Sequence, residues 1–247
     1  MATAIFAPTT REEGLIQELG YEDYFHDHHH GDKYQSNFVS HYIFSQDHKM
    51  IAKQFLITGM MWAIIGGLMS LVFRMQLGFP EESLAWLKPV LGKWITVSAD
   101  GIGKLQADFY YALVTMHGTI LVFFVLTAGL SGTFSNLLIP LMVGARDMAS
   151  PLLNMLSYWF FFISGMVMFA SLFLSTGPFA GGWVAYPPLS ALAEAMDGSK
   201  AGMTLWTISL VLFVVSVLLG GINYITTVLN LRTKGMTMWR LPLPIWA

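Results

Sequence analysis

The chain has 247 residues, of which 55% are hydrophobic and only 11% are charged, and its mean hydropathy is +0.57. Soluble domains carry about 25% charged residues. The composition therefore excludes a soluble globular enzyme, a disordered chain and a nucleic-acid-binding protein, and it indicates a membrane protein. The net charge of −2 favours no polyanionic partner, and the absence of cysteine excludes disulfides, iron–sulfur clusters and thiolate zinc sites.

The first 50 residues are polar and acidic, with eight acidic side chains against three basic ones. They lack the basic start, short apolar run and small-residue cleavage site of a signal peptide, so we predict a retained cytoplasmic arm over residues 1–41. The run His28-His29-His30 contains metal-ligand side chains. Adjacent histidines without a scaffold nevertheless favour a solvated arm.

Four long apolar runs follow, and each is long enough for the roughly 20 helical residues that cross a bilayer. Backbone groups find no water inside lipid, so these spans must be helices. We therefore predict an all-α fold, a polytopic transmembrane helix bundle over residues 42–247 with four spans and, near Pro242, the start of a fifth. The predicted spans are residues 51–73, 110–139, 152–175 and 204–231.

The basic residues predict the orientation of the bundle. One side receives more cations in its short loops, which makes it the cytoplasmic side and places the N-terminus inside. These cations are Lys49, Lys53, Arg146, Arg232, Lys234 and Arg240.

His117 is the one histidine of seven that lies inside an apolar run. An ionisable residue at membrane depth is costly, which makes it a candidate functional residue. It can be an axial ligand of a haem iron, with Gly118 leaving room for a flat group, or a histidine hydrogen-bonded to a neighbouring helix. No other histidine lies in a span, so a second ligand would be a methionine or come from outside the chain.

Two further candidates share the outer side of the bundle with His117. Arg74 ends the first span, where it can meet a polar haem substituent or anchor a helix end. Trp183 lies in an aromatic loop, where it can belong to an interfacial belt or donate its N–H to an anionic group.

Polar side chains gather on the inner side, about 28 Å beyond His117 along a regular α-helix. They can hold ordered water that a carboxylate supplies with protons, or they can cap helices and join them. Three amides and two hydroxyls come from three spans, and the carboxylate comes from the loop between two of them: Asn136, Asn154, Asn223, Ser157, Ser216 and Asp147.

The chain resembles the N-terminal part of subunit I of the haem–copper oxygen reductases, the catalytic subunit of cytochrome c oxidase. The resemblance extends over almost all of residues 42–247. Five stretches carry it: FSQDHKMIAKQF (44–55), MHGTILVFFVLTAGLSGTFSNLLIPLMVGARDM (116–148), LNMLSYW (153–159), GGWVAYPPLS (181–190) and GGINYITTVLNLR (220–232).

The resemblance implies a role for each candidate. His117 matches one of the two axial ligands of the low-spin haem iron, Arg74 matches the arginine at that haem's periphery, and Trp183 matches a tryptophan near the haem propionates. Asp147 matches the entrance carboxylate of a proton-uptake channel. The side chains that match its lining are Asn136, Asn154, Asn223, Ser157 and Ser216.

Three positions depart from the family pattern. Gln76 stands where relatives often carry a glutamate in an outer cation site, Leu152 replaces a common arginine, and Val217 replaces one of two successive channel serines. The second ligand of the low-spin haem has no match in this chain. The high-spin haem and the copper are likewise expected from a remainder of the protein.

The resemblance thus implies part of a terminal respiratory oxidase of the bacterial inner membrane, which reduces oxygen to water with electrons from cytochrome c and pumps protons. Expected partners are other oxidase subunits, cytochrome c or quinol, and lipid, with a respiratory supercomplex as a further candidate and no nucleic acid. The alternatives are a quinol oxidase or nitric oxide reductase large subunit, or a cofactor-free four-helix membrane scaffold.

Overall fold

A computed structural model describes residues 38–80, 82–195 and 198–246, and the chain divides into two units between Phe44 and Ser45. In the first unit, Val39–Ile43 (η1) form a π-helical turn, in which the Phe44 N–H donates to the Val39 carbonyl at 3.0 Å. The acidic arm predicted over residues 1–41, with its histidine run, lies almost entirely outside the described residues.

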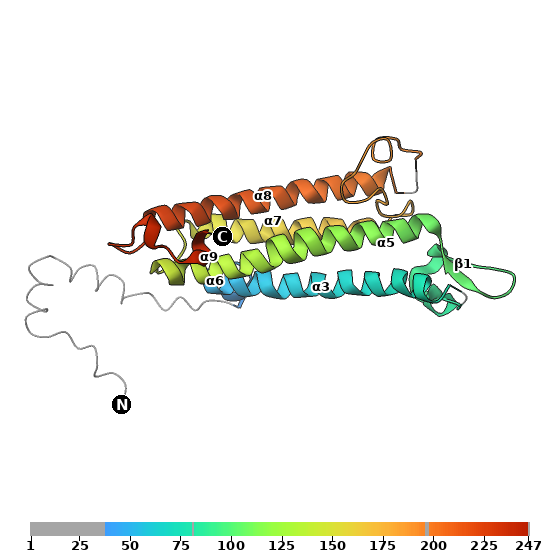
Figure 1. The fold of residues 1–247 in the computed structure, drawn as a ribbon, viewed down its shortest axis with the longest axis horizontal. Helices are drawn as coiled ribbons and strands as arrows, with labels where there is room; N and C mark the ends of the chain where they lie inside the picture. Colours follow the sequence, from blue (N-terminus) through green and yellow to red (C-terminus); the bar gives the residue numbers. More distant parts are fainter. Residues whose placement is uncertain (1–37, 81, 196–197, 247) are drawn as a thin grey trace, which may run out of the picture. The chain divides into compact units, whose positions relative to one another are not determined.

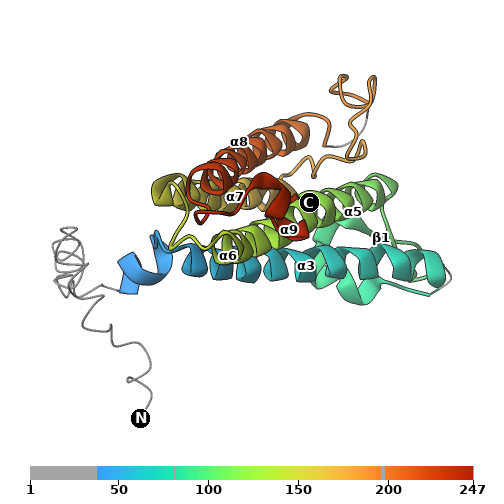
Figure 2. The ribbon, with the colours of Figure 1, turned by 60° about the vertical axis from the view of Figure 1, so that its left-hand side comes forward.

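The second unit contains four helical segments long and apolar enough to cross a membrane, which confirms the predicted all-α transmembrane bundle. Figures 1 and 2 show these segments side by side. The second segment is one continuous rod of three parts. In chain order the helices are α3 (His48–Gly78), α5 (Ala107–Thr119), η4 (Ile120–Leu130), α6 (Ser131–Val143), α7 (Pro151–Ala170) with the 3-10 turn η5 (Ser171–Phe173), and α8 (Ala201–Asn230).

Local sequence accounts for several helix ends. The Asp47 carboxylate caps α3 by accepting from the Lys49 N–H at 3.2 Å. The Ser150 hydroxyl caps α7, and Pro151 occupies the first position of that helix, where no N–H is needed. Gly144 ends α6 in the left-handed region with φ at +74°, which a glycine adopts without strain.

Short elements connect the long helices. Among the described residues the strands are confined to one antiparallel hairpin after α3, β1 (Ile95–Val97) and β2 (Gly103–Leu105). The sequence did not predict it, because strands of three residues are too short to show an alternating pattern. The remaining short elements are η2 (Ala85–Leu87), α4 (Lys88–Leu91), η3 (Gly92–Trp94), η6 (Met238–Arg240) and α9 (Leu243–Trp246).

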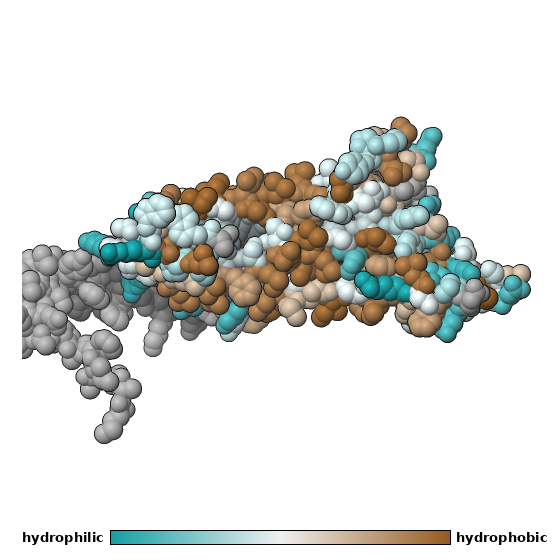
Figure 3. Space-filling view, viewed as in Figure 1, coloured by the Kyte–Doolittle hydropathy of each residue, from teal (hydrophilic) through white to brown (hydrophobic). Residues whose placement is uncertain are grey.

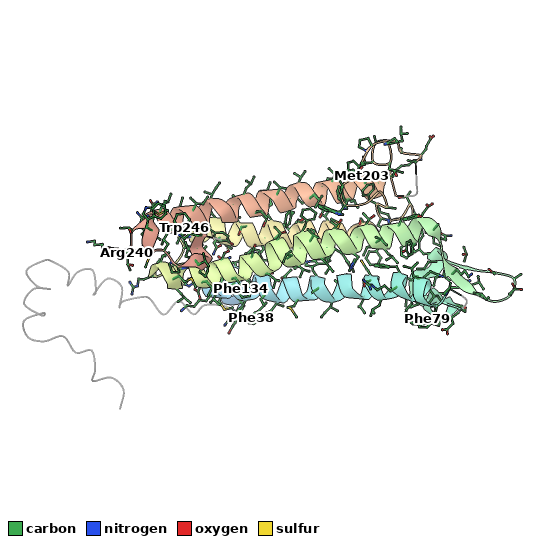
Figure 4. The ribbon with its side chains drawn as sticks, in the orientation of Figure 1. Phe38, Phe79, Phe134, Met203, Arg240 and Trp246 are labelled. Atoms are coloured by element: carbon green, nitrogen blue, oxygen red, sulfur yellow. The ribbon has the colours of Figure 1, made fainter. Side chains whose placement is uncertain are left out.

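The outward face of the bundle is apolar along the helices and polar toward both ends, as Figure 3 shows for one side. Such a face is suited to lipid acyl chains. Between the helices, the buried rings of Phe124 and Phe161 stack with their centroids 5.9 Å apart. Figure 4 labels side chains near the two ends: Phe79 and Met203 at one, and Phe134, Arg240 and Trp246 toward the other.

Two glycines allow a close approach between α3 and η4. A Cβ on Gly129 would lie 2.9 Å from the Gly59 Cα and 2.8 Å from the Phe124 carbonyl oxygen. The segment η4 is π-helical over eleven residues, and its wider turns change which side chains share a face. The spacing of 28 Å inferred for His117 and Asn136 assumed a regular α-helix, and η4 lies between them.

Substitution of Gly129 by alanine tests this contact. We expect Gly129→Ala to lower the free energy of unfolding by about 1–3 kcal/mol, because the added methyl meets backbone atoms that cannot rotate away. The measurement is the melting temperature of the helical circular dichroism signal in detergent. Gly67→Ala in α3 is the matched control, since a Cβ there meets nothing within 4 Å. Equal melting temperatures for the two variants would contradict the contact.

Candidate functional site

Asp147 lies in the loop between α6 and α7, opposite the first turn of α3, and we call this part of the bundle the Asp147 end. Its Oδ1 accepts from the Met148 N–H at 2.7 Å and lies 3.0 Å from His48 Nδ1. The His48 side chain is 4% exposed, whereas that of Asp147 is 40% exposed. The carboxylate is therefore held in place at one oxygen and remains open to water.

The three candidate asparagines are fully buried, one on each of α6, α7 and α8. Asn223 Oδ1 accepts from the Ser150 N–H at 2.8 Å, and Asn136 Nδ2 donates to the Gly132 carbonyl at 2.7 Å. Within the described part of the chain, four of their amide atoms have no hydrogen-bond partner: Asn136 Oδ1, Asn154 Nδ2, Asn154 Oδ1 and Asn223 Nδ2. An unpaired buried polar atom costs about 1–3 kcal/mol, so ordered water is the expected partner.

Ser157 and Ser216 lie deeper between α7 and α8. The Ser216 hydroxyl donates to the Ser157 carbonyl at 2.7 Å, and the Ser157 hydroxyl donates to the Asn154 carbonyl at 2.7 Å. Both serines line a cavity of about 40 Å³, together with Val217 and Tyr224 among others. The cavity is large enough for one or a few waters. Val217, one of the departures from the family pattern, contributes only methyl groups to it.

His117 lies on α5 toward the opposite end of the bundle, which we call the His117 end. Its Nδ1 lies 2.8 Å from the Gly66 carbonyl oxygen of α3. The Phe73 ring packs edge-on against the imidazole, with the two ring centroids 5.5 Å apart. A carbonyl oxygen only accepts, so Nδ1 carries the proton and Nε2 keeps its lone pair. Metal-binding histidines are commonly oriented in this way. The hydrogen bond to a neighbouring helix therefore leaves the other nitrogen available to a metal.

The loop that carries Trp183 is anchored beside His117. The Gly182 N–H donates to Thr115 Oγ1 at 3.0 Å. A Cβ on Gly118 would meet a single atom within 4 Å, Trp183 Cδ1 at 3.9 Å. The open surface at Gly118 and the free imidazole nitrogen together fit one axial ligand of a haem.

The other outer candidates are placed differently. Arg74 is exposed near the end of α3, and its guanidinium has no partner among the residues that the structure describes. Gln76 Oε1 accepts from the Leu105 N–H at 3.0 Å, which ties α3 to the hairpin. Leu152 is half exposed in the first turn of α7. The structure thus places Trp183 beside Gly118, the neighbour of His117, and leaves the Arg74 guanidinium exposed.

The sequence did not single out three residues of the Asp147 end. One is His48, which faces the carboxylate. Tyr224 joins α8 to α6, since its hydroxyl accepts from Asn136 Nδ2 at 3.1 Å. Thr227 Oγ1 accepts from the Ala149 N–H at 2.9 Å and so holds the loop after α6 against α8. The sequence could have indicated all three, because each is a polar residue near the inner end of the first or fourth span.

Removal of the Thr227 hydroxyl tests how the Asp147 loop is held. We expect Thr227→Val to speed hydrogen exchange at the Ala149 amide roughly fivefold, because this N–H loses its acceptor. Exchange followed by mass spectrometry measures it. Thr226→Val is the control, because the Thr226 hydroxyl donates only to carbonyls of its own helix. Identical exchange in both variants would show that the contact does not hold the loop.

Comparison with known proteins shows which family this chain resembles. The family model described as "Cytochrome C and Quinol oxidase polypeptide I" matches residues 50–247. "Alternative cytochrome c oxidase subunit 1" of Bradyrhizobium diazoefficiens is 40% identical over 205 residues, which cover 83% of this chain and 31% of that protein. "Cytochrome c oxidase subunit 1" of Synechocystis sp. is 36% identical over 210 residues, or 85% of this chain and 33% of that protein.

A relative with a broader name is also similar. "Heme-copper oxidase subunit I+III" of Aeropyrum pernix is 33% identical over 209 residues, which cover 85% of this chain and 23% of that protein. The chain thus spans about a third or less of the length of these relatives.

Proposed function

The chain belongs to the cytochrome c and quinol oxidase polypeptide I family, and we propose that it forms the first part of the catalytic subunit of a terminal respiratory oxidase. In the assembled enzyme, oxygen is reduced to water with electrons from cytochrome c, and the reaction is coupled to proton pumping. The chain spans about a third of the length of these relatives, and the ligands of the high-spin haem and of copper are proposed to come from other parts of the assembled enzyme.

The series of polar groups at the Asp147 end carries this proposal. The Asp147 side chain is 40% exposed, so its carboxylate is open to bulk water. Behind it, the unpaired amide atoms of Asn136, Asn154 and Asn223 hold ordered water. The cavity beside Ser157 extends this series toward the middle of the bundle. Protons taken up from one side against the membrane potential store about 2.3 kcal/mol per charge per 100 mV.

The His117 end is proposed to hold the low-spin haem, whose iron His117 Nε2 would bind. The haem, when bound, supplies one-electron transfer. The Gly66 carbonyl fixes the tautomer and orientation of the imidazole. The Arg74 guanidinium, which has no protein partner in the described structure, is available to a carboxylate at the haem periphery, and Trp183 lies beside the same surface. A second ligand of the iron would come from another part of the assembled enzyme.

The spans and the basic residues of the short loops indicate how the chain lies in the membrane. The chain is a multi-pass membrane protein, with four membrane-length helices among its described residues. We assign it to the bacterial inner membrane with the Asp147 end and the N-terminus at the cytoplasm, because the short-loop cations gather on that side. Its partners are other oxidase subunits and the electron donor, with a supercomplex as a further candidate.

Quinol is the alternative donor, since the family description covers both kinds of oxidase. A dinuclear copper site in a partner subunit would distinguish a cytochrome c oxidase from a quinol oxidase. The Asp147 and asparagine set favours an oxygen reductase over a nitric oxide reductase. The absence of haem absorption in the purified complex would instead favour a cofactor-free scaffold.

Replacement of Asp147 tests the proton-uptake role. In the assembled oxidase, Asp147→Asn should slow oxygen consumption roughly tenfold or more and abolish pumping, because an amide cannot bind and release protons. An oxygen electrode and the pH change outside vesicles measure the two effects. Asp100→Asn, in an exposed turn of the hairpin, is the control and should preserve both. Unaltered turnover and pumping in Asp147→Asn would remove the role.

Replacement of His117 tests the haem ligand. His117→Ala should abolish the low-spin haem band in the absorption spectrum of the purified complex, because methyl cannot replace the imidazole nitrogen at the iron. His48→Ala is the control, since that imidazole faces Asp147 instead. An unchanged low-spin spectrum in His117→Ala would mean that the ligand is another residue.

A further inference from the structure

Tyr224 touches both the candidate asparagine Asn136 and the deeper cavity. Its hydroxyl lies 3.1 Å from Asn136 Nδ2, and its side chain lines the cavity of about 40 Å³. The orientation of the amide is fixed by Gly132, because only the nitrogen can approach that carbonyl oxygen at 2.7 Å. The amide therefore donates to Tyr224, and the phenolic hydrogen is left for another acceptor.

The other hydroxyls that line the cavity have already used their hydrogens. The hydroxyls of Ser157, Ser216, Thr127 and Ser131 each donate to a backbone carbonyl. A hydroxyl has one hydrogen, so these groups offer only lone pairs to the cavity. Among the described lining residues, Tyr224 is thus the hydroxyl that can donate into it.

A water in this cavity needs both kinds of partner. It can donate its two hydrogens to serine or threonine lone pairs, but it must also accept a hydrogen bond to be held well. We propose that the Tyr224 hydroxyl donates to a water in this cavity and thereby positions it as the link between Asn136 and the Ser157–Ser216 pair. This inference rests on the proposed proton-uptake function of the Asp147 end.

Val217 offers a way to separate this role from a structural one. It lines the same cavity and lies seven residues, about two turns, before Tyr224 on α8, so both occupy one face of the helix. A serine at position 217 would place a second hydroxyl on the same wall, which can donate into the cavity whenever it is not bonded to a carbonyl of α8. Such a change should restore a link that depends on a donor, but it should not replace the hydrogen bond through which the Tyr224 hydroxyl joins two helices.

The test uses the assembled oxidase. We expect Tyr224→Phe to slow oxygen consumption roughly fivefold and to lower the number of protons pumped per electron, with the haem spectrum unchanged. Val217→Ser in the Tyr224→Phe background should restore both activities. Asp100→Asn in the Tyr224→Phe background is the control and should restore neither activity, because Asp100 lies in an exposed turn of the hairpin. Unmodified activity in Tyr224→Phe overturns the inference.

Alanine substitutions of Gly220 and Gly221 test the same inference even where the Tyr224→Phe enzyme does not assemble. A Cβ on Gly220, which lines the cavity, would lie 3.5 Å from both Cζ and the hydroxyl oxygen of Tyr224, an ordinary contact distance. Gly220→Ala should therefore fold, displace the water and slow turnover as Tyr224→Phe does. Gly221→Ala is the matched control, because a Cβ there meets nothing within 4 Å.

The outcomes also separate this inference from the proposed function. If Asp147→Asn slows turnover while Gly220→Ala and Gly221→Ala are both fully active, the Tyr224 link is wrong and the uptake role stands. If Asp147→Asn itself is fully active and pumps, the proposed function is wrong and the inference that rests on it is overturned too.

Discussion

Backbone N–H and C=O groups inside a bilayer find no water, so the four spans pair them within helices. The same constraint acts on polar side chains between the helices. Ser164 and Ser209 satisfy it completely, since each hydroxyl donates to the other residue's carbonyl, at 2.6 and 2.8 Å. Because lipid is as apolar as leucine, such bonds hold α7 against α8 where no hydrophobic force between the helices exists.

The asparagines of the Asp147 end meet this constraint only in part. Asn223 accepts from the loop through its oxygen, while its nitrogen has no partner among the described residues, and Asn136 shows the reverse pattern. One half of each of these two amides therefore joins elements of the bundle, and the other half faces a place where water is expected. For Asn136 and Asn223 the two interpretations, helix joining and water binding, describe different atoms of the same side chain, whereas both amide atoms of Asn154 lack a partner among the described residues.

At the His117 end, too, the polar atoms of one side chain have different roles. One ring nitrogen bonds a neighbouring helix, and this bond leaves the other with a lone pair. A single rod of α5, η4 and α6 carries His117 toward one end and Asn136 toward the other. The close approach of Gly59 and Gly129 places that rod against α3. Packing between these two glycines therefore bears on both ends of the molecule.

The sequence by itself determined the four spans, because apolar length and the lack of water in lipid leave helices as the only solution. Counting along those helices also placed His117 apart from the asparagines. Only the tertiary structure decided which amide atoms lack partners, that His48 faces Asp147 across 99 residues, and that Tyr224 reaches Asn136 across 88. These contacts depend on how each helix is rotated about its axis, which π-helical turns and glycine contacts between helices set and the hydrophobic pattern of one span does not.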